Sequence, residues 1–156
     1  MKKGHEAVLY RTCPGPSDSA GRRYSAFAAR AHEHGLRVHP VTTDDWKGGL
    51  SKEEYDLVHR RKEFGLTAAV CWGDPSANAL LAHCKREAIR VPEDLAIVGF
   101  NGIEPPVEPA RRLTTAKAYW SEVAQRAVFV LVDLIEGRQV PMRTVLPTDF
   151  VVGDTA

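Results

Sequence analysis

The sequence is poor in cysteine and has no long apolar run. Its three cysteines, Cys13, Cys71 and Cys84, are odd in number and lack CxxC spacing, which argues against a disulfide framework and against a zinc site. No stretch approaches membrane-spanning length, and the segment before Arg11 has too few apolar residues for a signal-peptide core. We therefore expect reduced cysteines, no membrane contact and a cytoplasmic location.

A strong net charge is also missing, because 21 Lys and Arg residues are balanced by 20 Asp and Glu residues. A stand-alone nucleic-acid binder needs a strongly basic surface, so the composition favours a small molecule or another protein as the partner.

The common catalytic motifs are absent as well. The sequence contains no GxSxG, no Walker-type GxxxxGK[ST], no GxGxxG and no HExxH. His32 and His34 lie two positions apart on an expected helix, where they point in different directions and make a poor metal pair. The acidic residues Glu53, Glu54 and Asp56 are interpreted as a solvated helix face. We expect no catalytic residue, no metal and no cofactor.

What the sequence does contain is an alternation of short apolar runs with helical periodicity. Its 156 residues, 44% of them hydrophobic, suit one domain or two lobes with unequal cores. The pattern predicts an α/β fold, with a parallel sheet flanked by helices on both faces. Strands are expected at residues 7–10, 38–41, 67–72, 95–98 and 113–116, and helices at 20–34, from 51, at 75–88 and at 121–135.

Local signals mark some element ends. Ser51 to Glu54 has the spacing of a capping box, and Asp74 followed by Pro75 is expected to be the N-cap and first residue of a helix. Residues 144–152 alternate loosely and include Pro147, which favours an edge strand.

The most informative stretch is residues 91–104, with the sequence VPEDLAIVGFNGIE. A turn is followed by a buried strand, and Gly99 to Gly102 stand at the carboxyl end of that strand. Open α/β sheets bind their ligands at such ends.

These segments together resemble the effector-sensing half of bacterial transcription regulators of the lactose-repressor and galactose-repressor type, which are related to periplasmic sugar-binding proteins of type I. The motifs that carry the resemblance occur in the order of that family: KKGHEAVLY, SAGRRYSAF, TAAVCWGDPSANALL, VPEDLAIVGFNGI, LTT, and LIEGR before LP. The resemblance implies a two-lobed sensor domain that binds an effector in its cleft and forms a homodimer.

The resemblance also implies a division of the chain. Residues 1–116 correspond to the carboxyl-terminal lobe, and residues 117–156 to a crossover, tail helix and strand that belong partly to the amino-terminal lobe. The rest of that lobe and the helix-turn-helix headpiece are expected to lie outside these residues, so DNA would be bound only through a headpiece that is not in this chain. An excised piece and a natural truncation both fit.

Two expected effector contacts follow from the positions that match the family. Arg23 stands where the family has an arginine after the first strand of this segment, and its planar fork suits a carboxylate or paired sugar hydroxyls. Trp46 stands where an aromatic residue often stacks on the effector. The alternatives are a solvated helix arginine and a lid over the second strand.

Asp74 and Asn101 complete the expected effector site. In the family the residue that matches Asp74 follows an asparagine, which is replaced here by Gly73, and helix capping explains Asp74 without a ligand. Asn101 replaces a usual aspartate and can donate as well as accept, so the ligand preference should differ. Ala118 stands where glutamine is frequent.

The helix at residues 75–88 corresponds to a dimer contact of the family. The expected interface residues lie on adjoining turns and are Asn78, Ala79, Ala82 and His83. An ordinary solvated helix face is the alternative.

The sequence therefore predicts the effector-sensing and dimerisation part of a bacterial DNA-binding transcriptional regulator. The effector would be a small polar metabolite such as a sugar or a nucleoside. A solute-binding protein of a sugar transporter and a truncated dimerisation module without a ligand are the alternatives. The identity of the effector, its role as inducer or corepressor, and the operator stay open.

Overall fold

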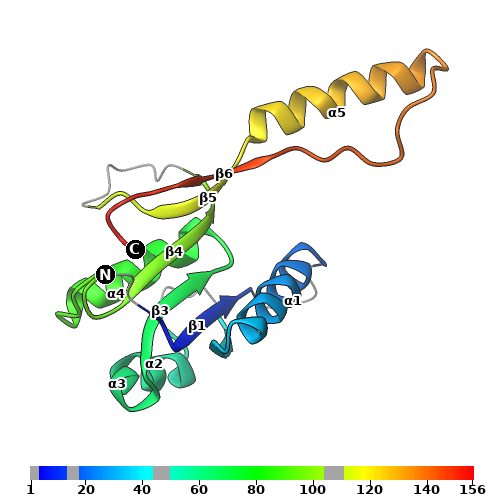
Figure 1. Ribbon diagram of the computed structural model, residues 1–156. Coiled ribbons are helices and arrows are strands. Elements are labelled where there is room, and N and C mark those ends of the chain that lie inside the picture. The colour runs from blue at the N-terminus through cyan, green and yellow to red at the C-terminus, as the bar shows by residue number, and fades with distance from the viewer. Residues whose placement is uncertain (1–3, 14–17, 44–49, 104–110) are drawn as a thin grey trace.

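In the computed structural model, residues 4–13, 18–43, 50–103 and 111–156 are described. They form a sheet in the strand order β2-β1-β3-β4-β5-β6, in which the first five strands run parallel and β6 runs antiparallel to β5 (Figure 1). The strands are β1 (Ala7–Thr12), β2 (Arg37–Thr42), β3 (Leu66–Cys71), β4 (Ala96–Asn101), β5 (Thr114–Ala118) and β6 (Thr148–Val151). The helices are α1 (Asp18–Glu33), α2 (Lys52–His59), α3 (Arg61–Phe64), α4 (Asp74–Arg86) and α5 (Trp120–Ile135).

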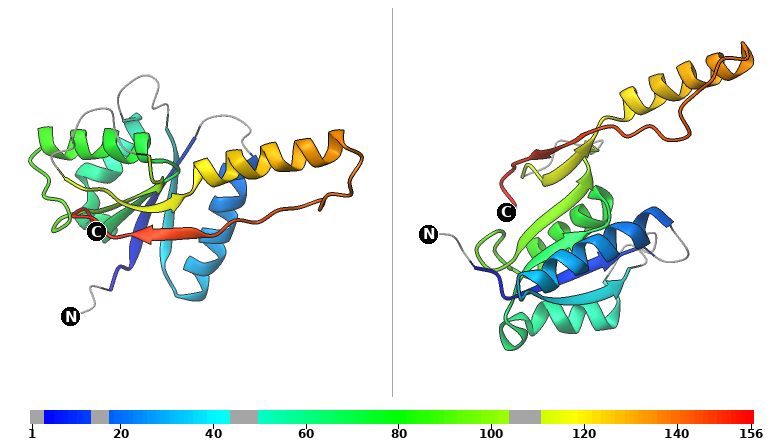
Figure 2. Two further views of the ribbon diagram at one scale, coloured as in Figure 1. Left: turned by 90° about the horizontal axis from the view of Figure 1, so that it is seen from above. Right: turned by 45° about the vertical axis from the view of Figure 1, so that its right-hand side comes forward.

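Helices cover both faces of the sheet, with α1 on one side and α4 on the other (Figure 2). The main apolar core lies between the sheet and the helices α2 and α4, where Val58 and Leu80 pack with strand residues such as Ile97. On the opposite face the ring of Tyr10 in β1 lies 5.1 Å from that of Tyr24 in α1. The predicted α/β fold with a helix-flanked parallel sheet is confirmed.

The predicted strands and helices are present, with ends that differ by a few residues. The strand expected at 95–98 is β4 (Ala96–Asn101) and therefore continues through Gly99 to the polar end of the motif. The expected edge strand is confirmed as β6, which is last in the strand order. The one-turn helix α3, which ends at Gly65 with a φ of 64°, was not predicted.

The two capping predictions have opposite outcomes. Ser51 is the N-cap of α2, and its hydroxyl accepts a hydrogen bond from the backbone N–H of Glu54 at 3.2 Å. The N-cap prediction for Asp74 is wrong, because α4 begins at Asp74 and its N-cap is Gly73. The Asp74 carboxylate instead accepts hydrogen bonds from other elements of the fold.

The interpretation of Glu54 as a solvated residue is also wrong. Glu54 and Arg11 are both 0% exposed, and Arg11 Nε lies 2.5 Å from Glu54 Oε1. Arg11 also donates a hydrogen bond to the backbone carbonyl of Ser76 in α4. Arg11 of β1 therefore connects α2 to α4 on the face of the sheet that these two helices cover.

The end of the chain returns to the sheet after the helix α5. Helix α5 projects away from the sheet, and the chain then runs back to form β6 beside β5 (Figures 1 and 2). The hydroxyl of Thr155 accepts from the backbone N–H of Thr114 at 2.9 Å and donates to the carbonyl of Ile97 at 2.7 Å. The tail is thus fixed to both β4 and β5.

The described helices include none that is both long enough and apolar enough to cross a lipid bilayer.

Candidate functional site

Arg23 of α1 reaches across the carboxyl ends of two neighbouring strands. Its Nη1 donates to the carbonyl of Trp72, directly after β3, at 2.7 Å, and its Nε donates to the carbonyl of Ser19 at 3.2 Å. Its Cζ lies 4.2 Å from the centre of the Phe100 ring in β4, which is a cation–π distance. These contacts hold a planar cation at the edge of the sheet where α/β proteins bind ligands.

The positive charge of Arg23 also acts on Tyr10 in β1. Burial raises the pKa of the Tyr10 hydroxyl, and the charge of Arg23 acts in the opposite direction. At neutral pH this side of the sheet therefore carries an arginine cation beside a neutral phenol.

Asp74 connects three elements near the same edge. Its side chain is almost completely buried, and its two oxygens accept from the Thr115 hydroxyl and from the Ile103 N–H, each at 2.6 Å. Burial raises the pKa of this carboxyl group, while the hydrogen bonds from Thr115 and from backbone groups counteract the rise. Asp74 thereby fixes the start of α4 against β5 and against the segment that follows β4.

Asn101 ends β4 in a backbone conformation that few residues adopt. Its φ is 109°, and the next residue, Gly102, has a φ of 68°. A Cβ on Gly102 would lie 2.5 Å from Cγ of Lys117, which pairs with Asn101 in the β4–β5 register. The turn therefore requires glycine after Asn101.

Asn101 also lies next to Gly73, the residue that follows Trp72 after β3. A Cβ placed on Gly73 would be 3.5 Å from the side-chain nitrogen of Asn101, an ordinary van der Waals distance. Gly73 and Asn101 are therefore neighbours, and a Cβ at position 73 would meet Asn101 without a clash.

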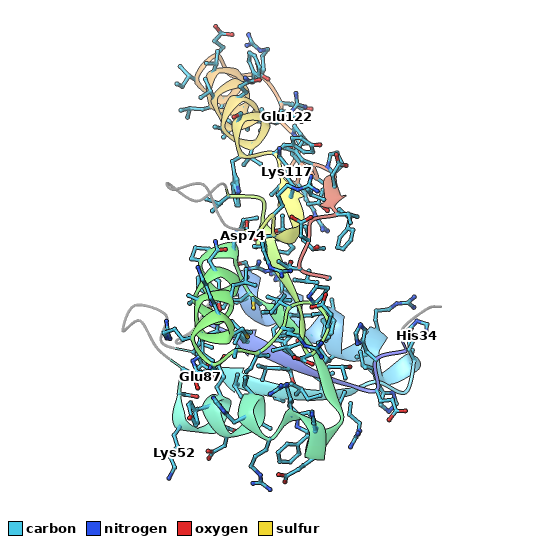
Figure 3. All side chains as sticks on the ribbon, turned by 90° about the vertical axis from the view of Figure 1, so that its left-hand side faces the viewer. His34, Lys52, Asp74, Glu87, Lys117 and Glu122 are labelled. Atoms are coloured by element: carbon cyan, nitrogen blue, oxygen red, sulfur yellow. The ribbon has the colours of Figure 1, made fainter. Side chains whose placement is uncertain are left out.

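The structure places Arg23, Asp74 and Asn101 near the carboxyl ends of β3 and β4. Figure 3 shows Asp74 and Lys117 on the side of the sheet from which α5 projects. Trp46 lies outside the described residues, so its expected role stays a prediction.

Sequence reasoning missed Trp72 and Lys117 as part of this region, and it included Phe100 only as a member of the stretch Gly99 to Gly102. Trp72 offers its backbone carbonyl and Phe100 its ring to Arg23, and the ammonium of Lys117 lies 5.8 Å from the centre of the Tyr119 ring. All three stand at or just after the end of a predicted strand. The rule that ligands bind at strand ends would have included Trp72 and Lys117 if it had been applied to every strand.

The expected dimer helix carries a groove of about 870 Å³ on one side, away from the strand ends. Asn78 and Ala82 line this groove together with Leu81 and Lys85. Ala79 is half-buried beside it. His83 is 5% exposed and faces α2, so the structure separates it from the other expected interface residues.

The comparison with protein families gives one match over the entire chain. The profile of the periplasmic binding protein-like domain matches residues 1–156. The chain is 34% identical over 134 residues to the HTH-type transcriptional repressor MelR of Bacillus subtilis (strain 168), which covers 84% of this chain and 37% of MelR. It is 33% identical over 100 residues to the arabinose metabolism transcriptional repressor of Geobacillus stearothermophilus, which covers 64% of this chain and 27% of that protein.

Solved structures share the fold. A LacI family transcriptional regulator from Bifidobacterium animalis subsp. lactis matches with a TM-score of 0.83 and 23% identity, over 97% of this chain and 55% of that one. A LacI family regulator from Arthrobacter sp. FB24, solved in complex with lactose, matches with a TM-score of 0.79 and 23% identity, over 97% and 58%. The chain spans at most 37% of the length of the two curated relatives. Those relatives are repressors rather than enzymes.

Proposed function

This chain belongs to the family of periplasmic binding protein-like domains, in the form shared with LacI-type transcriptional regulators, and we propose that it is the effector-sensing and dimerisation part of such a regulator. The effector would be a small polar metabolite such as a sugar or a nucleoside. The protein that carries the chain would act in the cytoplasm and would bind DNA through a headpiece outside these residues.

The observation that carries the proposal is the fixed position of the Arg23 guanidinium at the ends of β3 and β4. Two of its nitrogens, Nε and Nη1, bind protein carbonyls, and we assign Nη2 as the donor to the effector. A guanidinium that is already oriented loses little conformational entropy when it binds an oxygen of a ligand.

Asn101 and Asp74 receive different roles in this proposal. Asn101 would contact the effector through its amide, which both donates and accepts. Asp74 would not contact the effector directly, because its two oxygens already accept from Thr115 and Ile103 and its side chain is 1% exposed. We assign it to positioning the segment after β4.

Effector binding is tested by substitution of Arg23 in the longest natural protein that carries this chain. A thermal-shift screen of sugars, nucleosides and carboxylates should find a ligand that raises the melting temperature, because a ligand that binds the native state stabilises it. Arg23→Ala should abolish the shift.

The neighbouring Arg22 provides the control, because its side chain is 79% exposed and pairs with Asp18 on the helix surface. Arg22→Ala should leave the ligand-induced shift unchanged. A shift that survives Arg23→Ala would place the ligand elsewhere. A protein that binds nothing in the screen but still self-associates would favour the dimerisation module without a ligand.

We also propose that residues 117–156 belong partly to the first lobe of a two-lobed domain. Helix α5 has no buried residue, and its apolar side chains remain exposed, among them Trp120, Val123, Leu131 and Leu134. These four positions fall on one stripe of the helix, as in a helix that packs against another element, whereas the exposed Phe129 lies on the opposite side. The remainder of the first lobe would cover this stripe.

Dimerisation is proposed through the groove along α4, with Asn78, Ala79 and Ala82 in the contact. Ala82→Arg should shift the protein toward monomer in sedimentation velocity, because Ala82 is exposed and a bulky cation would enter the interface. Ala26→Arg, on an exposed position of α1, is the matched control and should leave the association unchanged. Equal sedimentation of the two variants would contradict this surface.

A further inference from the structure

Two histidines, one from α2 and one from α4, face each other in the helical layer on one side of the sheet. His59 is the last residue of α2, and His83 lies in the carboxyl-terminal half of α4. Their Nε2 atoms are 3.3 Å apart. This distance is long for an N–H···N hydrogen bond, but two imidazoles that bind one zinc ion at about 2.0–2.1 Å have their nitrogens about 3.3 Å apart in a tetrahedral site.

A carboxylate completes the group. Glu87 follows His83 by one helical turn, at the end of α4 (Figure 3). One ligand atom from each of His59, His83 and Glu87 lies within 4.8 Å of the other two, and this is the one such group found among the described residues. Glu87 is exposed, so its side chain can move the remaining distance at little cost.

The surroundings hold the two imidazoles in place. The Tyr55 ring stacks on His59 with the ring centres 4.0 Å apart and meets the edge of His83 at 5.8 Å. Two of the three ligand side chains are thus ordered before any ion binds, which lowers the entropy cost of binding.

Charged groups of both signs surround the two imidazoles. Arg86 and Arg11 repel a cation, but Arg11 is paired with Glu54, and Glu87 supplies a negative charge.

We propose that His59, His83 and Glu87 bind a divalent transition metal of the zinc type, which joins the end of α2 to α4. Two imidazoles and one carboxylate form a ligand set that zinc accepts, with a fourth position left for water. The site lies in the α2–α4 layer, away from Arg23 at the strand ends, so it does not depend on the proposed effector site.

The experiment is a calorimetric titration of the untagged protein with zinc chloride, followed by a melting curve. One zinc per chain should bind, and zinc should raise the melting temperature by several degrees. Glu87→Gln and His59→Gln should each weaken zinc binding at least about tenfold, which is the effect of disturbing even an indirect partner of a metal site. His83 is left unchanged because it is buried and its substitution would disturb the core.

His32→Gln is the matched control, because His32 is an exposed histidine on α1. It should leave both the zinc affinity and the melting temperature with zinc unchanged. A weak surface site has a dissociation constant on the order of 100 μM. Absence of one-to-one binding at about that zinc concentration would therefore overturn the proposal. Zinc binding that survives both Glu87→Gln and His59→Gln but is lost in Cys13→Ser would overturn it as well.

Discussion

The buried pair of Arg11 and Glu54 shows what a single charge contributes in this fold. Both side chains are 0% exposed, and the pair connects β1 to α2. Glu54→Gln should lower the free energy of unfolding by about 3–5 kcal/mol, because it leaves the Arg11 charge buried without its counter-ion. Urea denaturation measures this loss.

Glu53 offers the matched control, since it is adjacent and exposed. Glu53→Gln should change the free energy of unfolding by no more than about 0.5 kcal/mol. If Glu54→Gln lowered the free energy of unfolding no more than Glu53→Gln does, the ion pair would add nothing to stability.

Cys84 is predicted to be an unreactive thiol. It is fully buried, and burial raises its pKa to about 11 from an ordinary value of 9.0. Because the folded state disfavours the thiolate, the stability that Cys84 contributes is complete below pH 9 and is lost as the pH rises to about 11. Labelling with a disulfide reagent at pH 8 should modify the half-buried Cys13 first and Cys84 only on unfolding.

A Cys84→Ala variant tests the link between this thiol and pH. Its melting temperature should fall less between pH 9 and pH 11 than that of the unchanged protein, whereas Cys13→Ser should behave like the unchanged protein. Rapid labelling of Cys84 at pH 8 would contradict the prediction.

The site residues could be predicted from the sequence only in part. Arg23 and Asn101 come from positions that match a motif, and the structure places both at the strand ends. The partners of Asp74 and Glu54 are 41 and 43 residues away in the sequence, at Thr115 and Arg11. No local pattern encodes such a contact, so capping and solvation were the nearest local explanations for these two carboxylates.

At the scale of elements, two glycines near Asn101 tolerate change very differently: Gly102 lies in the turn after β4, and Gly73 lies between β3 and α4. Gly102→Ala should cost more than about 1 kcal/mol, because its φ is 68° and the added Cβ would lie 3.0 Å from the Lys117 Cα. Gly73→Asn should stabilise by a few tenths to about 1 kcal/mol, because Gly73 is the N-cap of α4 in an extended conformation. Thermal denaturation of both variants measures the difference. If both variants lost the same stability, the space beside Gly73 would be too small for an added side chain.

Most elements were predictable because their signal is periodic. Buried parallel strands such as β3 appear as continuous apolar runs, and α1 shows helical spacing ended by Gly35. Strand ends were less predictable, since the pairing of Phe100 and Asn101 with β5 extends β4 past its apolar run. The four-residue helix α3 is too short to show a period at all.

At the scale of the whole molecule, the uncovered stripe of α5 predicts opposite effects in two proteins. Leu131 is 56% exposed in this chain. Leu131→Asp should make the 156-residue chain more soluble, because it removes exposed apolar surface. In a protein that includes the first lobe, the same change should cost about 2–5 kcal/mol, because the leucine would be in the core there. Sedimentation and urea denaturation measure the two effects.

Arg126 lies on the polar side of α5 and provides the control. Arg126→Asp should leave the stability of the longer protein within about 0.5 kcal/mol. If Leu131→Asp were equally harmless there, α5 would not pack against a first lobe.

The return of the tail to the sheet sets an order for assembly during synthesis. Thr155 meets Ile97 across 58 residues of chain and Thr114 across 41. Contacts between distant residues form late, because a long loop must close first. Until the tail emerges from the ribosome, β5 is left as an open edge, and an open edge is where a growing chain pairs with a strand of its neighbour.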